Sequence, residues 1–323
     1  MSVRRILPPA LWLGLAGLVL AAPATREVAP GLRLLPGRFM EGEQPDGNTL
    51  LLDAPEGLIV VDTGRHPRHT QAIIDLARAE GRPVAAVINT HWHLDHTGGN
   101  GRLRQVFPGA PVYGTDAARL AMDGFLTQYR AWLLGEVKRL EADSLARRPL
   151  ESELEILADS LALLPDSLVT VEGPRQIAGR ELRFGLTSHA VTSSDLWIFD
   201  PLTRVLIVGD LVTLPAPLLD TACPKGWKRE LARLAEVDFT LLVPGHGPPL
   251  SRAEFERWRG AFTRLLLDAD SEMSRDSCAE GWMRDVAPLI PEADRQLARS
   301  LLDYSIDNLL RGDPARLKAI CGR

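Results

Sequence analysis

The run PVAAVINT (83–90) is followed at once by HWHLDH (91–96), and together they indicate the type of fold. The first part is a short run rich in Val, Ile and Ala, bounded by Pro83, which is typical of a buried strand. The second part places four side chains that can bind metal within six residues. Alternate residues of an extended chain point the same way, so His91 and His93 can share one ion. The turn that follows lets Asp95 and His96 face a second ion.

Strand and helix patterns alternate on both sides of this stretch. NTLLLDA (48–54) and GLIVVDTG (57–64) precede it as apolar runs, and residues 70–80 have helical spacing that ends at Gly81. A strand, a helix and a strand in this order predict a layered α/β fold. A second series of strands with one helix, around residues 227–237, follows at LVTVEG (168–173), ELRFGLT (181–187), DLWIFD (195–200), RVLIVGD (204–210) and FTLLVPG (239–245).

Two helical regions complete the predicted organisation. Residues 116–164 form two or three amphipathic helices inserted between the strand-rich halves, with an apolar stripe at Leu133, Leu134, Val137 and Leu140. The apolar stripe of this insertion either serves only to form a core, or the insertion also covers an active-site cleft. We predict a main domain over residues 25–270 and a helical C-terminal extension over residues 271–323.

The first residues are typical of a secretory signal peptide. Arg4 and Arg5 precede an uncharged stretch that ends in small residues, so we predict a signal over residues 1–24. A membrane anchor is the alternative, but Pro8 and Pro9 shorten the usable helix to about 15 residues, against the roughly 20 that a span needs. We therefore expect a periplasmic or secreted protein with no stable membrane anchor after cleavage.

Charge and cysteine content narrow the partners and the chemistry. The formal net charge of −5 includes no long basic run, so nucleic acid is excluded and a small-molecule substrate is expected. Export permits disulfides, and Cys278 and Cys321 are expected to close the tail, with Cys223 left over. The alternative is that all three cysteines are buried free thiols. A catalytic role for Cys223 is disfavoured.

The histidines are concentrated after predicted strands. Five of the seven lie in three such places, which are HWHLDH, the end of RFGLTS at His189, and the run PGHG at His246. Asp210 ends another strand. Loops at strand ends converge on one edge of a layered sheet, so these distant residues can meet.

Taken together, H-x-H-x-D-H, a later lone histidine, a strand ending in Gly-Asp and a final PGHG resemble the metallo-β-lactamase superfamily, from Leu32 to Leu250. The resemblance implies a four-layer αββα sandwich with metals at one edge of the two sheets. It implies that Asp62 supports the ligands without binding metal itself. The ligands that it implies are His91, His93 and His189 for the first ion, Asp95, His96 and His246 for the second, and Asp210 as the bridge.

The loop that carries His189 departs from the family pattern. In much of the superfamily the lone histidine is followed directly by Thr, with an acidic residue four positions after the histidine. Here the run from His189 to Asp195 reads HAVTSSD, and the strand after it matches the pattern from Asp195 to Asp210. We expect a loop two residues longer, with His189 as the ligand.

The resemblance implies a hydrolase with two zinc ions per chain, although iron or manganese is left open. A zinc-bound hydroxide, held by ligands that include Asp95 and Asp210, is expected to attack an ester, thioester, lactone or amide carbonyl. A β-lactamase is the alternative, and Asp210 argues against it because lactamase branches of the family usually lack this aspartate. A catalytically silent metal-binding or sensor protein is the second alternative, against which the complete ligand set argues.

Overall fold

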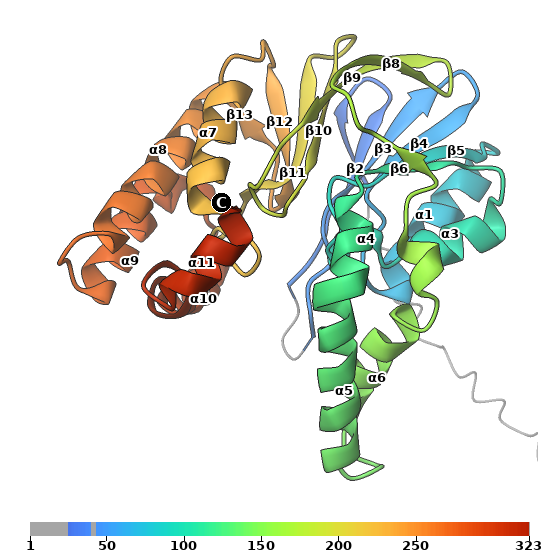
Figure 1. Cartoon of the computed structure of the whole chain (residues 1–323). Helices are drawn as coiled ribbons and strands as arrows, with labels where there is room; N and C mark the ends of the chain where they lie inside the picture. The colour runs from blue at the N-terminus through green and yellow to red at the C-terminus, as the bar shows by residue number, and fades with distance from the viewer. Residues whose placement is uncertain (1–24, 40–42, 323) are drawn as a thin grey trace, which may run out of the picture.

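The structure, a computed structural model that describes residues 25–39 and 43–322, contains two mixed β-sheets packed face to face (Figure 1). The predicted signal peptide, residues 1–24, lies outside the described residues. The first sheet has antiparallel pairing up to its fourth strand and parallel pairing beyond it. Its strands, in spatial order, are β1 (Arg26–Ala29), β2 (Leu32–Leu35), β3 (Thr49–Ala54), β4 (Gly57–Val61), β5 (Val84–Ile88), β6 (Val112–Gly114) and β7 (Ser167–Leu168).

The second sheet is antiparallel except for its pair β11 and β12, which run parallel. Its strands, in spatial order, are β13 (Leu250–Ser251), β12 (Leu241–His246), β11 (Val205–Thr213), β10 (Leu196–Asp200), β9 (Arg180–Leu186) and β8 (Gly173–Ile177). All nine residues of β11 are buried, as expected for a central strand covered on both faces.

Helices cover the outer face of each sheet, which confirms the predicted αββα layers (Figure 1). On the first sheet these are α1 (Pro67–Ala79) and α3 (Asn100–Val106), and on the second they are α7 (Pro224–Leu234), α8 (Arg252–Ala269), α9 (Arg275–Asp285) and α10 (Arg295–Ser305). The remaining helices are α2 (Leu94–Thr97), α4 (Ala117–Ala121), α5 (Thr127–Arg139), α6 (Arg147–Ile156) and α11 (Pro314–Cys321). Among the described residues, none of the helices has the length and apolar character needed to cross a bilayer.

Three buried tryptophans attach the C-terminal helices to the central strand. The indole N–H groups of Trp227 and Trp258 donate to the carbonyls of Leu211 and Thr213 in β11, at 2.9 and 2.8 Å. All three rings, that of Trp282 included, are at most 1% exposed and pack in one apolar cluster on the outer face of the second sheet. A buried indole satisfies its single donor in this way at little cost. α7 and α8 therefore bond directly to β11, whereas Trp282 of the tail helix α9 packs in the same cluster and donates to the carbonyl of Pro215, just after β11, at 3.2 Å.

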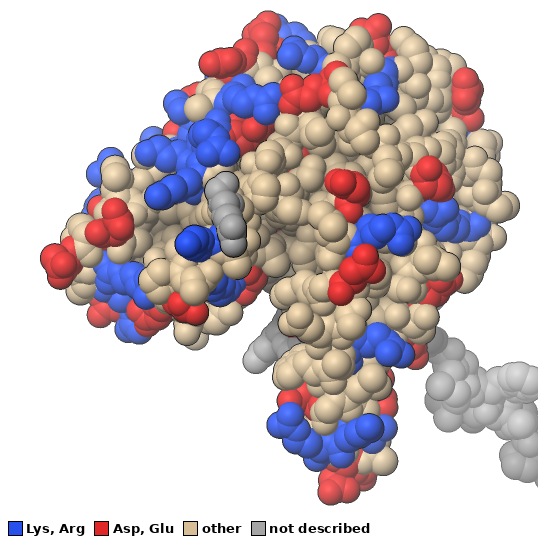
Figure 2. Space-filling view, in the orientation of Figure 1, with Lys and Arg blue, Asp and Glu red and all other residues tan. Residues whose placement is uncertain are grey.

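The inserted helices α4, α5 and α6, which we call the arm, lie between β6 and β7 in the sequence and project from the sandwich (Figure 1). Leu133 and Val137 are buried, as predicted, and Leu133 packs in one cluster with residues of α4 and α6, whereas Leu134 is 37% exposed. Trp92 and Leu94 belong to the same apolar cluster, so the base of this arm packs on the segment HWHLDH. On the face shown in Figure 2, charged side chains of both signs gather at the far end of the arm.

The predicted disulfide between Cys278 and Cys321 is wrong. Cys321 in α11 pairs with Cys223, whose Cα atom lies 4.9 Å away, and Cys278 is a buried free thiol. The reason is packing, because Cys278 faces the apolar cluster between α8 and α10, whereas α11 lies against the residue that precedes α7. Burial raises the pKa of the Cys278 thiol, which further lowers its reactivity.

We expect peptide mapping of unreduced protein to show one linked pair, containing Cys223 and Cys321. Cys278 should react with an alkylating reagent only after unfolding, because its side chain is 0% exposed. The variant Cys278→Ser is the control and should leave the linked pair unchanged. Recovery of a Cys278–Cys321 peptide would contradict the assignment.

Candidate metal centre

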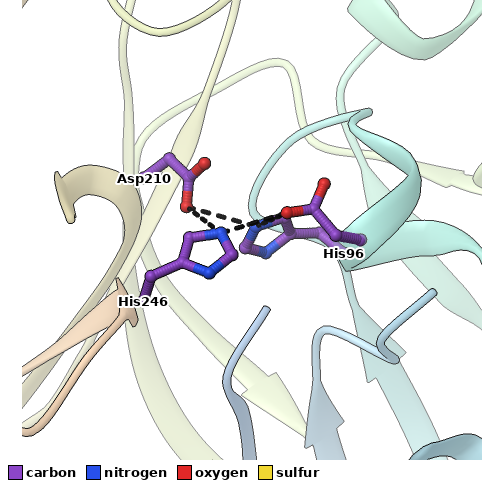
Figure 3. A group of neighbouring side chains, drawn as sticks. His96, Asp210 and His246 are labelled. Atoms are coloured by element: carbon purple, nitrogen blue, oxygen red, sulfur yellow. Dashed lines mark ion pairs between the residues drawn. The ribbon is translucent and has the colours of Figure 1, made fainter. Parts of the chain in front are cut away.

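The predicted ligands from three separate segments, HWHLDH, β11 and β12, meet at the edge where both sheets end. His91 and His93 follow β5, Asp95 and His96 lie in the single turn of α2, Asp210 is in β11 and His246 ends β12. They form two groups in which ligand atoms lie within 4.8 Å of one another. The first group is Asp95, His96, Asp210 and His246, and the second is His91, His93 and Asp210. Asp210 belongs to both. In Figure 3, Asp210, His96 and His246 point toward one another.

The atoms that face each other lack hydrogen-bond partners. Nε2 of His91, His96 and His246 and both carboxylate oxygens of Asp210 are buried without one. Their nearest neighbours are close, with His246 Nε2 3.0 Å from Asp95 Oδ2 and His96 Nε2 3.2 Å from Asp210 Oδ1, but these contacts do not have hydrogen-bond geometry. Buried polar atoms are ordinarily satisfied, and leaving one unpaired costs about 1–3 kcal/mol. Five such atoms, distributed over the two ligand groups, fit bound cations.

Asp62 orients two of the histidines from behind. Its Oδ2 atom accepts hydrogen bonds from Nδ1 of His96 at 2.8 Å and from the hydroxyl of Thr90 at 2.7 Å. Because the Thr90 proton is used there, the contact of 3.0 Å between Thr90 Oγ1 and Nδ1 of His91 requires the imidazole to donate. Both rings thus donate from Nδ1 and turn Nε2 toward the centre, with the outer nitrogen held by a hydrogen-bond partner as is usual for metal-binding histidines. The backbone of Asp62 has a positive φ of 60°, which turns its side chain beneath the ligands.

The charge states of the centre suit a cation. Burial, reinforced by the neighbouring His96 and His93, holds the pKa of His91 well below its ordinary range, so this ring is neutral. Burial raises the pKa of Asp210, but His96 and His246 outweigh that effect and lower it. Burial likewise lowers the pKa of His96, but Asp210, Asp95 and Asp62 raise it well above its ordinary range. A cation must therefore displace a proton from His96 when it binds.

Arg65 connects the ligand Asp95 to the inserted helices. Its guanidinium lies 3.4 Å from Asp95 Oδ1 and 2.5 Å from Glu153 Oε2 in α6. The hydroxyl of Tyr129 in α5 donates to the same Glu153 oxygen at 3.2 Å. All of these groups except Tyr129 are nearly fully buried, so their mutual charges are weakly screened. The arm therefore helps to fix one carboxylate of the metal centre.

Two glycines allow the backbone to approach the ligands. A Cβ atom on Gly245 would lie 2.0 Å from Asp210 Oδ1, and one on Gly47 would lie 2.5 Å from Cε1 of the His96 ring. Either contact is far shorter than a real Cβ atom shows. The glycine of PGHG is thus required by the close approach of β12 to Asp210.

His189 was expected to join His91 and His93, but the structure does not bring it to them. Its Nδ1 atom lies 2.9 Å from Ser188 Oγ, its ring lies beside Gly322 at the C-terminal end, and it is in neither ligand group of the described residues. The backbone explains this placement, since His189 has a positive φ of 53° at the tip of a turn. Its carbonyl also packs against Gly226, where a Cβ atom would lie 1.7 Å away.

Asp195 closes the turn that contains His189. Its carboxylate accepts from the backbone N–H of Val191 and Thr192 and from the hydroxyls of Thr187 and Thr192, at 2.7–3.2 Å. Burial still raises its pKa to about 6. Thr192 and Asp195 have the spacing of the family pattern. That pattern places its histidine directly before the threonine, and here Val191 occupies that position. It is 1% exposed and packs in the apolar cluster of the second sheet.

A cavity of about 430 Å³ opens onto the centre. His93, Asp95 and Asp210 reach it, together with Arg65, Asp220 and Thr221. Most of its remaining wall is apolar. Phe125 and Leu126 come from the insertion and Leu301 from the tail, and the loops beside them add Phe39, Trp92 and Leu218. Sequence reasoning missed Arg65 and Thr221. Arg65 directly follows the run VDTG, which was a usable signal, whereas nothing in the sequence around Thr221 marks it.

Comparisons with known proteins agree with this geometry. The family model described as the metallo-beta-lactamase superfamily matches residues 43–246. A linear primary-alkylsulfatase of Pseudomonas sp. is 26% identical over 227 residues, which are 63% of this chain and 42% of that protein. A hydroxyacylglutathione hydrolase of Synechococcus sp. is 37% identical over 71 residues, 19% of this chain and 28% of that protein. The chain thus spans less than half the length of these relatives.

Solved structures show the same fold at low identity. A metallo-beta-lactamase from Pontibacter korlensis superposes with a TM-score of 0.56 at 19% identity, covering 74% of this chain and 98% of that one. A stereoselective inverting sec-alkylsulfatase from Pseudomonas sp. superposes with a TM-score of 0.58 at 19% identity, covering 92% of this chain and 52% of that one.

Proposed function

Because the chain belongs to the metallo-beta-lactamase superfamily, we propose that it is a dinuclear metal-dependent hydrolase that cleaves an ester, thioester, lactone or amide bond of a small molecule. Zinc is the proposed metal, and the ligands proposed are the six residues of the two groups, His91, His93, Asp95, His96, Asp210 and His246. The observation that carries the proposal is the set of unpartnered buried ligand atoms facing one another beside an open cavity.

The side chains around the centre have separate tasks in this proposal. Asp62 and Thr90 fix the histidine rings so that Nε2 of His91 and of His96 faces inward. Burial raises the pKa of Asp95, but His96 and His246, with a smaller contribution from Arg65, outweigh it and hold this pKa well below its ordinary range. A divalent cation supplies Lewis acidity, which makes water acidic enough to attack at neutral pH and withdraws electrons from the bond under attack.

The cavity wall favours a substrate with an apolar group. Phe125 and Trp92 lie with their ring centroids 5.4 Å apart, and Phe125 is 50% exposed. Large apolar side chains with partly exposed faces are the usual lining of small-molecule pockets, where a few polar groups set the orientation. Arg65, Asp220 and Thr221 are the polar groups here. We propose that the apolar part of the substrate contacts these rings while the bond to be cleaved lies at the metals.

A hydrolysis screen tests the proposal. Zinc-loaded protein should hydrolyse at least one member of a panel of lactones, thioesters, carboxylic esters, amides and β-lactams with apolar side groups. Stripping the metals with a chelator should abolish turnover, and adding zinc should restore it. A matched chain carrying His189→Ala is the control and should keep its activity, because His189 is in neither ligand group. Turnover that persists without metal would refute the proposal, and no turnover on any substrate would favour a silent metal-binding protein.

A sulfate ester is the second candidate substrate. The match with the linear primary-alkylsulfatase extends over 63% of the chain, far more than the match with the hydroxyacylglutathione hydrolase. An alkyl sulfate also combines an apolar chain with an anionic head, which suits an apolar cavity ending at a cationic centre. Alkyl sulfates therefore belong in the same panel, and cleavage of these alone would replace the carbonyl proposal.

We also propose that the protein works in the periplasm or is secreted. The signal-like residues 1–24 support this location, and so does the pairing of Cys223 with Cys321, since disulfides persist in oxidising compartments. N-terminal sequencing of the protein recovered outside the cytoplasm tests the location, and a start at Met1 would count against cleavage.

A further inference from the structure

The two contacts of the Thr221 hydroxyl determine which atom donates in each hydrogen bond. Its hydroxyl donates to the carbonyl oxygen of Val191 at 2.9 Å, and its Oγ1 atom lies 2.8 Å from Nε2 of His93. A carbonyl oxygen can only accept, so the single hydroxyl proton is used on Val191. The second contact therefore requires His93 Nε2 to carry the proton and donate it to Thr221. Nδ1 is then the atom of His93 that keeps a free lone pair.

The two ligand groups differ in the number of ligand atoms that they provide. Asp95, His96, Asp210 and His246 provide four ligand atoms, which complete the usual tetrahedral set for zinc. His91, His93 and Asp210 provide three, and Asp210 is shared with the other group. The place of a third histidine beside them is not filled by His189, whose ring lies at the turn tip near Gly322. A cation in the three-ligand group therefore depends strongly on the orientation of each ring.

The C-terminal tail holds the loop that carries Thr221. Cys223 is bonded to Cys321, and the Tyr304 hydroxyl donates to Asp220 Oδ1 at 3.1 Å. The guanidinium of Arg316 in α11 donates to the Asp220 carbonyl. Residues on both sides of Thr221 are thus attached to α10 and α11, which lie beside α7 in Figure 1. Leu301 of α10 also lines the cavity.

We propose that Thr221 is a positioning residue that fixes the tautomer and orientation of His93, and that the three-ligand group is a weaker cation site whose affinity depends on this contact and on the tail that holds it. The inference rests on the proposed metal-binding function. It assigns the tail helices a part in the metal centre, in addition to their packing on the second sheet.

Titration of the metal-free mature protein with zinc against a competing chelator tests this directly. Wild type should show two dissociation constants that differ by at least ~10-fold, following the ligand counts. Thr221→Val keeps the shape but removes the hydroxyl, and should weaken the looser site by about 10–100-fold, the usual effect of removing a hydrogen-bond partner of a ligand. The tighter constant should stay within about twofold of wild type. Thr221→Ser keeps the hydroxyl and should bind like wild type.

Two further comparisons, one between cysteine variants and one by NMR, separate this role of Thr221 from a general loss of structure. Cys321→Ser releases the tail and should weaken the looser site, whereas Cys278→Ser should not. ¹⁵N NMR of the metal-free protein should show the Nε2–H form of His93 in wild type and in Thr221→Ser, and a mixture of tautomers in Thr221→Val. Two unchanged constants in Thr221→Val, or an equal loss in Thr221→Ser, would overturn the inference while leaving the proposed function standing. Weakening by His189→Ala would also overturn it. A wild-type protein that binds no zinc would remove the proposed function and the inference together.

Discussion

Replacing Asp210 with Asn should lower turnover by at least ~100-fold and reduce the bound zinc from two ions to one. Asp210 is the only residue shared by both ligand groups, and both of its oxygens are buried without hydrogen-bond partners. Asparagine keeps the shape but removes the negative charge that offsets the repulsion between two cations. The three-ligand group loses its only carboxylate, so the ion there should leave first. The remaining ion should stay with Asp95, His96 and His246.

The measurement is elemental analysis and turnover on the same sample, after unfolding curves show that the variant is folded. Asp200→Asn is the matched control, because Asp200 is also a buried carboxylate but pairs with Arg180, away from the ligands, at 2.7 Å. It should lose stability and keep both metals. Two zinc ions and normal turnover in Asp210→Asn would make Asp210 a structural residue only.

Gly245→Ala should remove activity although it replaces no ligand residue. The added Cβ would lie 2.0 Å from Asp210 Oδ1 and 2.7 Å from the carbonyl carbon of Gly209, so both the carboxylate and the backbone of β11 must shift. Overpacking of this kind costs about 1–3 kcal/mol of unfolding free energy. Because Asp210 belongs to both groups, we expect loss of at least one zinc ion and a fall in turnover of ~100-fold or more.

Gly260→Ala provides the comparison for Gly245→Ala. Gly260 lies in the middle of α8 and a Cβ there would meet nothing within 4 Å. Alanine is favoured over glycine in a helix by roughly 0.5–1 kcal/mol, so this variant should be slightly more stable and fully active. Chemical denaturation and zinc content of the two variants measure the difference. Equal zinc content in both would show that β12 has room to move away from Asp210.

The segment HWHLDH and the strands around it were predictable because their signals are local. An apolar run ending in closely spaced ligands specifies both the buried strand β5 and the site at its end. The edge strand β8 was not predicted. It reads GPRQI, without an apolar run, and forms only because β9 offers hydrogen bonds along its length. Edge strands depend on such pairing more than on their own side chains.

The positions of His189 and Cys321 were not predictable from the same kind of signal. His189 is the only histidine in its region, but the register of the turn is set by Asp195, which accepts hydrogen bonds from Thr192 and Val191. Counting back from Thr192, in place of choosing the nearest histidine, would have indicated Val191. The partner of Cys321 depends on how α11 packs against the start of α7, a contact between segments 98 residues apart. No local pattern encodes that contact.

Anomalous scattering at the zinc edge, measured on crystals of the zinc-loaded protein, would locate the metals. We expect a strong peak among Asp95, His96, Asp210 and His246 and a weaker one bounded by His91, His93 and Asp210. The ring of His189 should lie outside both. No peak at these residues, or a peak ligated by His189, would contradict the metal centre described here.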